Sequence, residues 1–235
     1  MIIKLIAHSG FYVELERVAF LIDYWKGELP RFTGDKGLMV LASHAHPDHF
    51  NPGVLSLPGT GPETVYVFSE DIRKSVPVRR TDERIHFMRS REDRNFRCGK
   101  AEVRVRTLRS TDQGVAFLWE AEGRLFYHAG DLNWWAWDDD TPAESESMRD
   151  RYQTEIDYLA SLLDGRRLEA AFLPLDPRLE EGKFLGFDYF ARHIDACRYY
   201  PMHFWETKNI GIIRQLKEQK FAALYRDKVK EYTFS

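Results

Sequence analysis

The chain has 235 residues, of which 43% are hydrophobic and 14% aromatic, enough to bury a large core. One compact α/β domain over residues 1–235 is therefore the expected organisation. The 34 basic and 37 acidic residues are mixed along the chain and leave a formal net charge of -3. This balance argues against nucleic acid or an anionic membrane as a partner.

Targeting and redox signals are also weak. No stretch approaches the ~20 apolar residues of a membrane span, and the apolar N-terminal run is too short for a signal peptide, so we expect a cytoplasmic protein. The two cysteines, Cys98 and Cys197, lack metal-type spacing and are too few for a disulfide framework. They are expected to be inert thiols.

The first half of the chain predicts a sheet with parallel additions. Short β-type runs at 2–6, 11–15 and 18–22, separated by turn residues, predict an antiparallel meander. A loop over 26–37 leads into an apolar run that predicts a buried strand. The elements expected from there are a strand at 38–42, a short helix after 51–53, a strand at 65–68 and a helical turn or two at 70–75.

The second half predicts another sheet and the main helices. Four β-type runs with short connections indicate a second antiparallel sheet, at 84–88, 101–108, 115–121 and 124–127. Apolar positions at helical spacing predict a helix over 145–163 that stops before Gly165. Strands and helices then alternate, at 170–175, 187–196, 198–202 and 210–218. Two sheets with helices on their outer faces predict a four-layer α/β/β/α sandwich.

Metal-binding residue types concentrate directly after the buried run at 38–42. The segment Ser43-His44-Ala45-His46-Pro47-Asp48-His49 carries three imidazoles and one carboxylate. Extended backbone points His44 and His46 to one face, while Pro47 turns the chain so that Asp48 and His49 approach from another side. Two adjacent metal positions become feasible. Without a cation, imidazoles packed this closely would repel on protonation and waste hydrogen-bonding capacity.

This His-x-His-x-Asp-His pattern resembles the hallmark of the metallo-β-lactamase superfamily and matches it without a gap. Residues 7–11 (Ala-His-Ser-Gly-Phe), 127–131 (Tyr-His-Ala-Gly-Asp) and 201–204 (Pro-Met-His-Phe) resemble motifs of its L-ascorbate 6-phosphate lactonase-like branch. The resemblance implies that Asp131 bridges two metal positions and that His203 is the last ligand of the second. It also implies that His8 belongs to the site and that His128 is a neighbour, which we place behind the ligands.

The residues themselves are compatible with these roles. Asp131 and His203 each follow a β-type run, so both could reach the sheet edge that carries the first motif. Taken alone, Asp131 after Gly130 is ordinary turn chemistry, and a lone His203 is more often a core histidine. The accompanying motifs favour the site for both.

One position departs from the resembled families. They carry a histidine before the Ser-Thr-Asp or similar segment that precedes a Gly-Val strand, and this chain has Arg109 there. Because arginine cannot ligate a cation, the first position would keep His44, His46 and Asp131 but bind its ion more weakly. Alternatively, Arg109 takes the place of that ion and binds a substrate carboxylate or phosphate. A salt-bridged surface arginine is the remaining reading.

Three tryptophans follow the Asp131 motif, in the segment Asn133-Trp134-Trp135-Ala136-Trp137. Indole offers a large apolar area with one donor, which suits the wall of a substrate pocket. Core packing is the commoner use of tryptophan. Both interpretations stay open.

Together these features predict a metal-dependent hydrolase of a small-molecule lactone, phosphoester or amide, with Asp48 orienting or deprotonating the water unless it is fully committed as a ligand. Zinc suits the histidines, manganese or iron the carboxylates, with one or two ions bound. The alternative is a catalytically impaired metal- or ligand-binding protein in which Arg109 has disabled the first position. A nuclease is disfavoured because no basic stripe is present. Homo-oligomerisation stays open.

Overall fold

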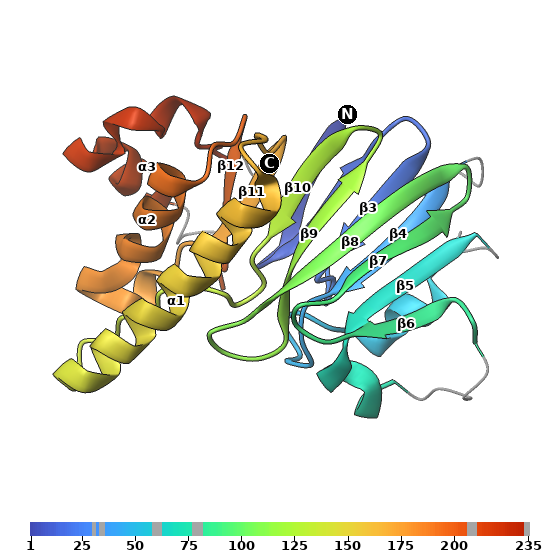
Figure 1. Ribbon diagram of the computed structural model, residues 1–235, viewed down its shortest axis with the longest axis horizontal. Coiled ribbons are helices and arrows are strands. Elements are labelled where there is room, and N and C mark those ends of the chain that lie inside the picture. The colour runs from blue at the N-terminus through green and yellow to red at the C-terminus, as the bar shows by residue number, and fades with distance from the viewer. Residues whose placement is uncertain (30–31, 33–35, 58–62, 77–81, 206–210, 233–235) are drawn as a thin grey trace.

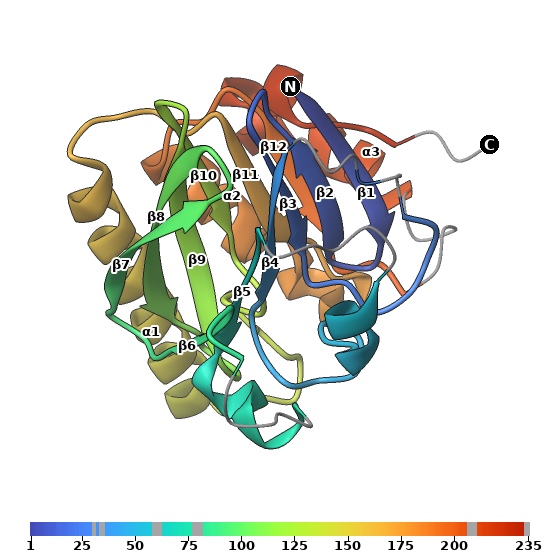
Figure 2. The same cartoon turned by 90° about the vertical axis from the view of Figure 1, so that its right-hand side faces the viewer.

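The computed structural model describes residues 1–29, 32, 36–57, 63–76, 82–205 and 211–232. Two six-stranded sheets pack face to face, with helices on the outer face of each (Figures 1 and 2). This arrangement confirms the predicted four-layer α/β/β/α sandwich. Among the described residues, no helix combines the length and the apolarity needed to cross a bilayer.

The first sheet begins with the predicted antiparallel meander and continues in parallel pairs from β3 to β6. Its outer face is covered by two short 3-10 helices, η1 (Pro52–Ser56) and η2 (Glu70–Lys74). In spatial order its strands are β1 (Ile2–Ala7), β2 (Gly10–Glu14), β3 (Val18–Ile22), β4 (Gly37–Ala42), β5 (Thr64–Ser69) and β6 (Ile85–Met88).

The second sheet is antiparallel from β7 to β10 and parallel from β10 to β12. Its strands are β7 (Asp93–Cys98), β8 (Ala101–Arg109), β9 (Val115–Ala121), β10 (Arg124–His128), β11 (Ala170–Pro174) and β12 (Tyr199–Met202). The helices that accompany it are α1 (Pro142–Leu163), η3 (Pro177–Phe184), α2 (Leu185–His193), α3 (Gly211–Glu218), η5 (Lys220–Leu224) and η6 (Arg226–Lys228).

One expectation about strands was wrong, and one strand was not predicted. The run at 84–88 was expected in the second sheet, but β6 pairs in parallel with β5 and closes the first. The second sheet starts instead with β7, a strand that no apolar run in the sequence predicts. Only Phe96 and Cys98 of β7 are buried, because an edge strand needs few inward side chains and can carry charges outward.

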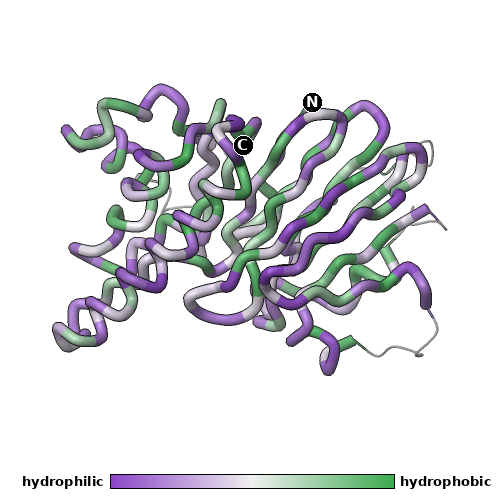
Figure 3. The backbone as a smooth tube through the Cα atoms, in the orientation of Figure 1, coloured by the Kyte–Doolittle hydropathy of each residue, from purple (hydrophilic) through white to green (hydrophobic). Residues whose placement is uncertain are grey.

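The main core lies between the sheets and extends under α1 and α2. Strands β3 and β4 are buried along their whole length, as parallel strands covered on both faces must be. Figure 3 shows hydrophobic stretches, in green, within the region of the two sheets. Trp119 of β9 stacks on Phe126 with ring centroids 5.3 Å apart and contacts Phe20 of the first sheet at 5.5 Å. Aromatic contacts thus tie the two sheets together.

Helix α1 begins and ends as its sequence dictates. Thr141 and Glu144 form a capping box, in which each side chain bonds the backbone of the other residue, and Pro142 occupies the first turn. Asp164 takes the left-handed conformation with φ 49° at the end, just before Gly165. The face that carries Ile156 packs into the core. Helix α1 therefore covers the outer face of the second sheet.

Burial makes Cys98 an unreactive thiol. Its side chain is fully buried, and desolvation raises its pKa to about 12. At pH 8 roughly one Cys98 in ten thousand would be a thiolate, the form that attacks alkylating agents. We expect iodoacetamide to modify the half-buried Cys197 first, and Cys98 only after unfolding. Peptide mass spectrometry with and without denaturant checks this; rapid alkylation of Cys98 in the native protein would contradict it.

Candidate metal centre

The site lies at one edge of both sheets. Strands β1, β3 and β4 run in the same direction, and so do β8, β10, β11 and β12, as their pairings show. Polar residues follow the ends of these strands and meet between the sheets. Backbone hydrogen bonds join loops of the two sheets there: His203 N–H donates to His8 O at 3.1 Å, and Val115 N–H donates to Ser43 O at 2.9 Å.

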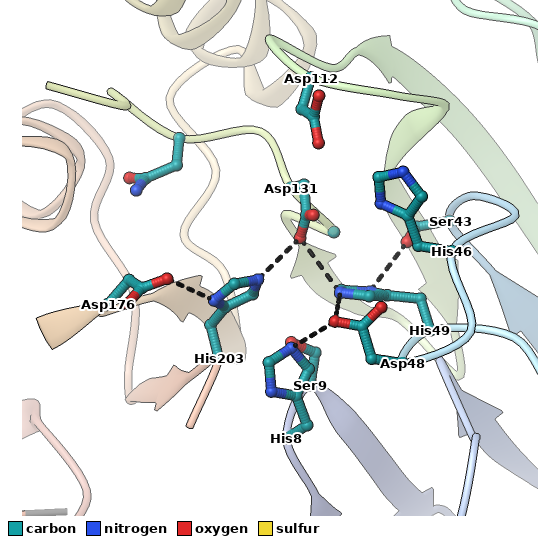
Figure 4. Close-up of polar contacts among 12 residues, drawn as sticks. His8, Ser9, Ser43, His46, Asp48, His49, Asp112, Asp131, Asp176 and His203 are labelled. Carbon is teal, nitrogen blue, oxygen red and sulfur yellow. Dashed lines mark hydrogen bonds and ion pairs between the residues drawn. The ribbon is translucent and has the colours of Figure 1, made fainter. Parts of the chain in front are cut away.

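One group of donors comes from both halves of the chain. The side chains of His8, Asp48, His49 and His203 each offer a ligand atom, and these atoms lie within 4.8 Å of one another. His8 Nε2 is 3.2 Å from Asp48 Oδ2, at the bottom of the group in Figure 4. The structure thus brings His203, the residue assigned to the second metal position, together with Asp48, His49 and His8, and we call this set the second group.

The other donor group, which we call the first group, lies beside it. Ligand atoms of His44, His46 and Asp131 also lie within 4.8 Å of one another. His44 Nε2 is 3.0 Å from His46 Nδ1 and 3.4 Å from Asp131 Oδ2. His44 and His46 thus face the same space, as their alternation in extended backbone predicts. This group matches the predicted first metal position.

Asp131 stands between the two groups. Its Oδ2 faces His44 at 3.4 Å, while its Oδ1 lies 3.2 Å from His49 Nε2 and 3.4 Å from His203 Nε2. One carboxylate therefore offers an oxygen to each group, which is the geometry of a bridging ligand. Figure 4 shows this central placement.

The unpaired atoms of the site fit a cation. Within the described residues, the buried His49 Nε2 and Asp131 Oδ1 lack hydrogen-bond partners. His49 Nδ1 donates to Asp23 Oδ2 at 2.8 Å, so its Nε2 carries a lone pair toward Asp131. Two buried lone pairs that face each other 3.2 Å apart are costly unless a positive charge lies beside them. The donor set therefore suits divalent metal ions.

Asp23 orients one histidine of each group. Its Oδ2 accepts from His49 Nδ1 and, at 2.6 Å, from Ser43 Oγ. Since the Ser43 hydroxyl proton is used there, its oxygen accepts from His44 Nδ1 at 2.9 Å. Both imidazoles are thereby held with Nε2 toward Asp131. Asp23 is fully buried, so this orientation is rigid.

Asp176 plays the same part for His203. His203 Nδ1 donates to Asp176 Oδ2 at 2.9 Å, which directs Nε2 toward Asp131. Asp176 also accepts a fork of hydrogen bonds from Arg178. His8, Asp23 and His203 all adopt left-handed backbone, with φ of 55°, 45° and 74°. This uncommon conformation re-aims each side chain at a strand end and concentrates strain at the site.

The protein groups around Asp131 attract positive charge. Burial opposes the charged form of Asp131, but His49 and His203 outweigh it and hold the pKa of this carboxyl well below its usual range. Burial likewise opposes protonation of His203, yet Asp131 and Asp176 raise its pKa to about 9. The pKa of Asp48 falls to about 2, because His8 and His49 outweigh its own desolvation. Asp48 and Asp131 are therefore ionised at neutral pH, and a metal ion bound to His203 would take the place of the proton that these carboxylates stabilise on its ring.

His128 lies behind the donor groups, where the sequence placed it. Gly130 N–H donates to His128 Nδ1 at 3.1 Å, so Nε2 carries the proton and donates to Ser9 O at 2.9 Å. Burial lowers the pKa of His128 and keeps the ring neutral. Both nitrogens are therefore committed to the backbone, and His128 positions the loop that bears Asp131.

The structure contradicts the expectation that Arg109 lies at the first metal position or binds a substrate anion. This arginine ends β8, where alternation turns Leu108 into the core and Arg109 outward. There its backbone N–H donates to Glu155 of α1 at 3.1 Å, and its side chain lines a separate hollow beside α1. Arg109 therefore occupies neither the first metal position nor the substrate cavity. From this segment, Thr111 and Asp112 reach the cavity instead.

The two donor groups open into a cavity of about 410 Å³. Of the three tryptophans predicted to wall a pocket or fill the core, Trp135 and Trp137 line it, stacked at 6.3 Å, whereas Trp134 packs on Tyr152. Trp135 Nε1 donates to Asp131 O at 2.9 Å, so the wall also fixes the bridging loop. The lining residues are His46, Pro47, Asp48, Thr111, Asp112, Asp131, Trp135, Trp137, Met148, Arg178, His203 and Trp205.

Sequence reasoning missed three carboxylates of this site: Asp23, Asp112 and Asp176. A usable signal existed for two of them. Asp23 directly follows the apolar run 18–22, and Asp176 follows the apolar run 170–175, the placement that singled out the histidine motif. Asp112 gave a weaker signal. The resembled families carry a histidine in this segment, and Arg109, not Asp112, was aligned with it.

Comparison with known proteins relates the chain to one superfamily. The model of the beta-lactamase superfamily domain matches residues 2–143. No curated protein sequence matches the chain. A solved structure of a protein from Parabacteroides distasonis is similar over 97% of this chain and 90% of its own, with 14% identity and a TM-score of 0.64.

Two further structures share the fold. A protein from Veillonella parvula is similar over 98% of this chain and 96% of its own at 12% identity, with a TM-score of 0.62. The diiron β-hydroxylase CmlA from Streptomyces venezuelae covers 86% of this chain and 44% of its own at 12% identity, with a TM-score of 0.52. At these identities the likeness shows the fold alone.

Proposed function

The chain belongs to the beta-lactamase superfamily, and from this premise we propose that it is a metal-dependent hydrolase of a small-molecule lactone, phosphoester or amide. One observation carries the proposal: two neighbouring donor groups, joined by Asp131, lie at an open cavity. Divalent ions held there would lower the pKa of a water molecule to roughly 7 and polarise the bond to be broken. Zinc fits the imidazoles, and manganese or iron the carboxylates.

The donor residues fall into two sets according to the metal position that they would form. His8, His49, His203 and Asp48 would hold one ion, His44 and His46 would hold the other, and Asp131 could contribute one oxygen to each. Asp48 sits among three imidazoles, so we assign it to holding the cation rather than to taking a proton. In hydrolysis the water oxygen would bond to the acyl carbon or phosphorus as the bond to the leaving group breaks, while solvent in the open cavity would take the proton lost by the water and supply one to the leaving group.

The cavity walls favour a compact substrate with an apolar part. A volume of about 410 Å³ accommodates a small molecule. Trp135, Trp137 and Trp205 supply aromatic wall. Arg178, the one arginine or lysine among the described lining residues, stands at 5.9 Å from the Trp137 ring and 5.7 Å from the Trp205 ring. No stripe of cations for a nucleic-acid backbone accompanies it among those lining residues.

The alternative function rested on the predicted position of Arg109. A catalytically impaired binding protein was the alternative because Arg109 was placed in the first metal position. Arg109 lies outside that position, and its charge does not enter the cavity. We therefore keep hydrolysis as the single proposed function.

The test combines metal exchange with a substrate panel. Protein stripped by a chelator and reloaded with Zn²⁺, Mn²⁺ or Fe²⁺ is assayed on lactones, phosphomonoesters, phosphodiesters and amides. We expect one class to be hydrolysed with at least a hundredfold dependence on metal, and His203→Ala to lose about as much. His193→Ala serves as the matched control, because His193 is exposed and stacks on Tyr189 away from the site. Absence of metal-dependent hydrolysis in metal-loaded protein would refute the proposal.

A further inference from the structure

The two donor groups differ in what the chain brings to them. The second group has His8, Asp48, His49 and His203, and Asp131 Oδ1 adds a fifth donor. The first has only His44, His46 and the other oxygen of Asp131. A divalent ion at the first position would thus have three protein donors, against five at the second, which on a five- or six-coordinate ion leaves a gap for a further protein ligand beside the catalytic water.

Asp112 lies across the cavity from that gap. It lines the same cavity as His46 and Asp131, and Figure 4 shows its carboxylate on the side that faces these two residues. In the described part of the chain, no hydrogen bond or ion pair occupies this carboxylate. Asp112 lies outside the compact group formed by His44, His46 and Asp131, so its side chain would swing inward as an ion binds.

The loop that carries Asp112 is fastened to the loops that carry the other donors. Thr111 Oγ1 donates to Asn133 O at 2.7 Å and accepts from Asn133 N–H at 3.0 Å, which ties it to the loop after Asp131. On the other side of Asp112, Gly114 has φ +67°, and a Cβ there would meet Ser43 O at 2.0 Å. Gly114 therefore lets the loop press against the backbone next to His44. The backbone of Asp112 is fixed, and only its side chain needs to move.

We propose that Asp112 is the fourth protein donor of the first metal position, which becomes a site of two imidazoles and two carboxylates. This inference rests on the metal-dependent function proposed above. Carboxylate oxygen is a harder donor than imidazole nitrogen, so Asp112 shifts the first position toward manganese or iron, compared with a three-histidine site. The second position, with three imidazoles, keeps the stronger preference for zinc.

The test measures metal binding directly. Metal-free wild type, Asp112→Asn and Asp112→His are titrated with Mn²⁺ and with Zn²⁺ by calorimetry, and bound metal is counted by mass spectrometry after desalting. We expect Asp112→Asn to weaken one of two Mn²⁺ sites about 10- to 100-fold and to leave the other unchanged. Asp112→His should restore Zn²⁺ binding at that site but not Mn²⁺ binding. Asp139→Asn, which alters an exposed carboxylate, is the matched control.

The outcomes separate the two proposals. If Asp112→Asn binds two ions with wild-type affinities, Asp112 is not a ligand, and the proposed hydrolase stands without it. If the wild type binds no ion, both proposals fail. A loss shared by Asp112→Asn and Asp139→Asn would assign the effect to surface charge and overturn the role of Asp112.

Discussion

Asp131→Ala is expected to abolish metal-dependent hydrolysis and to lower the affinity of both metal positions. Among the described residues, Asp131 is the one whose two oxygens face both donor groups, at 3.4 Å from His44 Nε2 and 3.2 Å from His49 Nε2. Loss of a bridging charge removes several kcal/mol of electrostatic stabilisation, which corresponds to a rate lower by a factor on the order of 10³ or more. No other substitution in the site should affect both ions so strongly through direct contact.

Metal content per chain and steady-state rates on the substrate found above check this expectation. Asp139→Ala, eight residues further along, is the control, because its side chain is exposed. Circular dichroism of both variants shows whether the fold persists. Retention of both ions by a folded Asp131→Ala would show that this carboxylate does not bridge.

Asp23→Asn is expected to weaken both metal positions and to destabilise the fold, although Asp23 touches no ion in the proposed scheme. Its carboxylate accepts from Ser43 N–H at 2.7 Å, from Ser43 Oγ and from His49 Nδ1. An asparagine of the same shape places an NH₂ donor against such donors. We expect the free energy of unfolding to fall by about 3 kcal/mol, since the bonds are fully buried. Metal affinity should fall about 10- to 100-fold at each position.

Asp176→Asn provides the comparison for this prediction. Asp176 is also fully buried but orients only His203, so it should weaken the second position and spare the first. Chemical denaturation of the metal-free proteins and two-site metal titrations measure both effects. If Asp23→Asn weakened only one metal position, the hydrogen bonds from Asp23 through Ser43 would not be what orients His44.

Much of the site was predictable because its residues stand at strand ends. The motif from His44 to His49 follows the apolar strand β4, and Asp131 and His203 follow β10 and β12, so topology alone brings them to one edge. Their convergence needed no knowledge of loop conformation. The same reasoning would have found Asp23 and Asp176, which were overlooked because a lone aspartate after a strand is also common turn chemistry.

The errors arose where sequence carries little physical signal. Strand β7 is an edge strand with four exposed residues out of six, so no apolar pattern marks it. Arg109 was placed at the site by counting positions against a resembled family, but strand alternation turns it toward α1, and the chain reaches the cavity only after it, at Thr111 and Asp112. Loop registers of this kind depend on contacts such as Thr111 with Asn133, which no periodicity reveals.

The central claim is that two divalent ions lie side by side and share Asp131. Crystals of zinc- or manganese-loaded protein, measured with X-rays above and below the absorption edge of the metal, test it most directly. The account predicts two anomalous peaks on opposite sides of the Asp131 carboxylate, one beside His44 and His46, the other beside His8, His49 and His203. Peaks elsewhere, or none between these side chains, would contradict it.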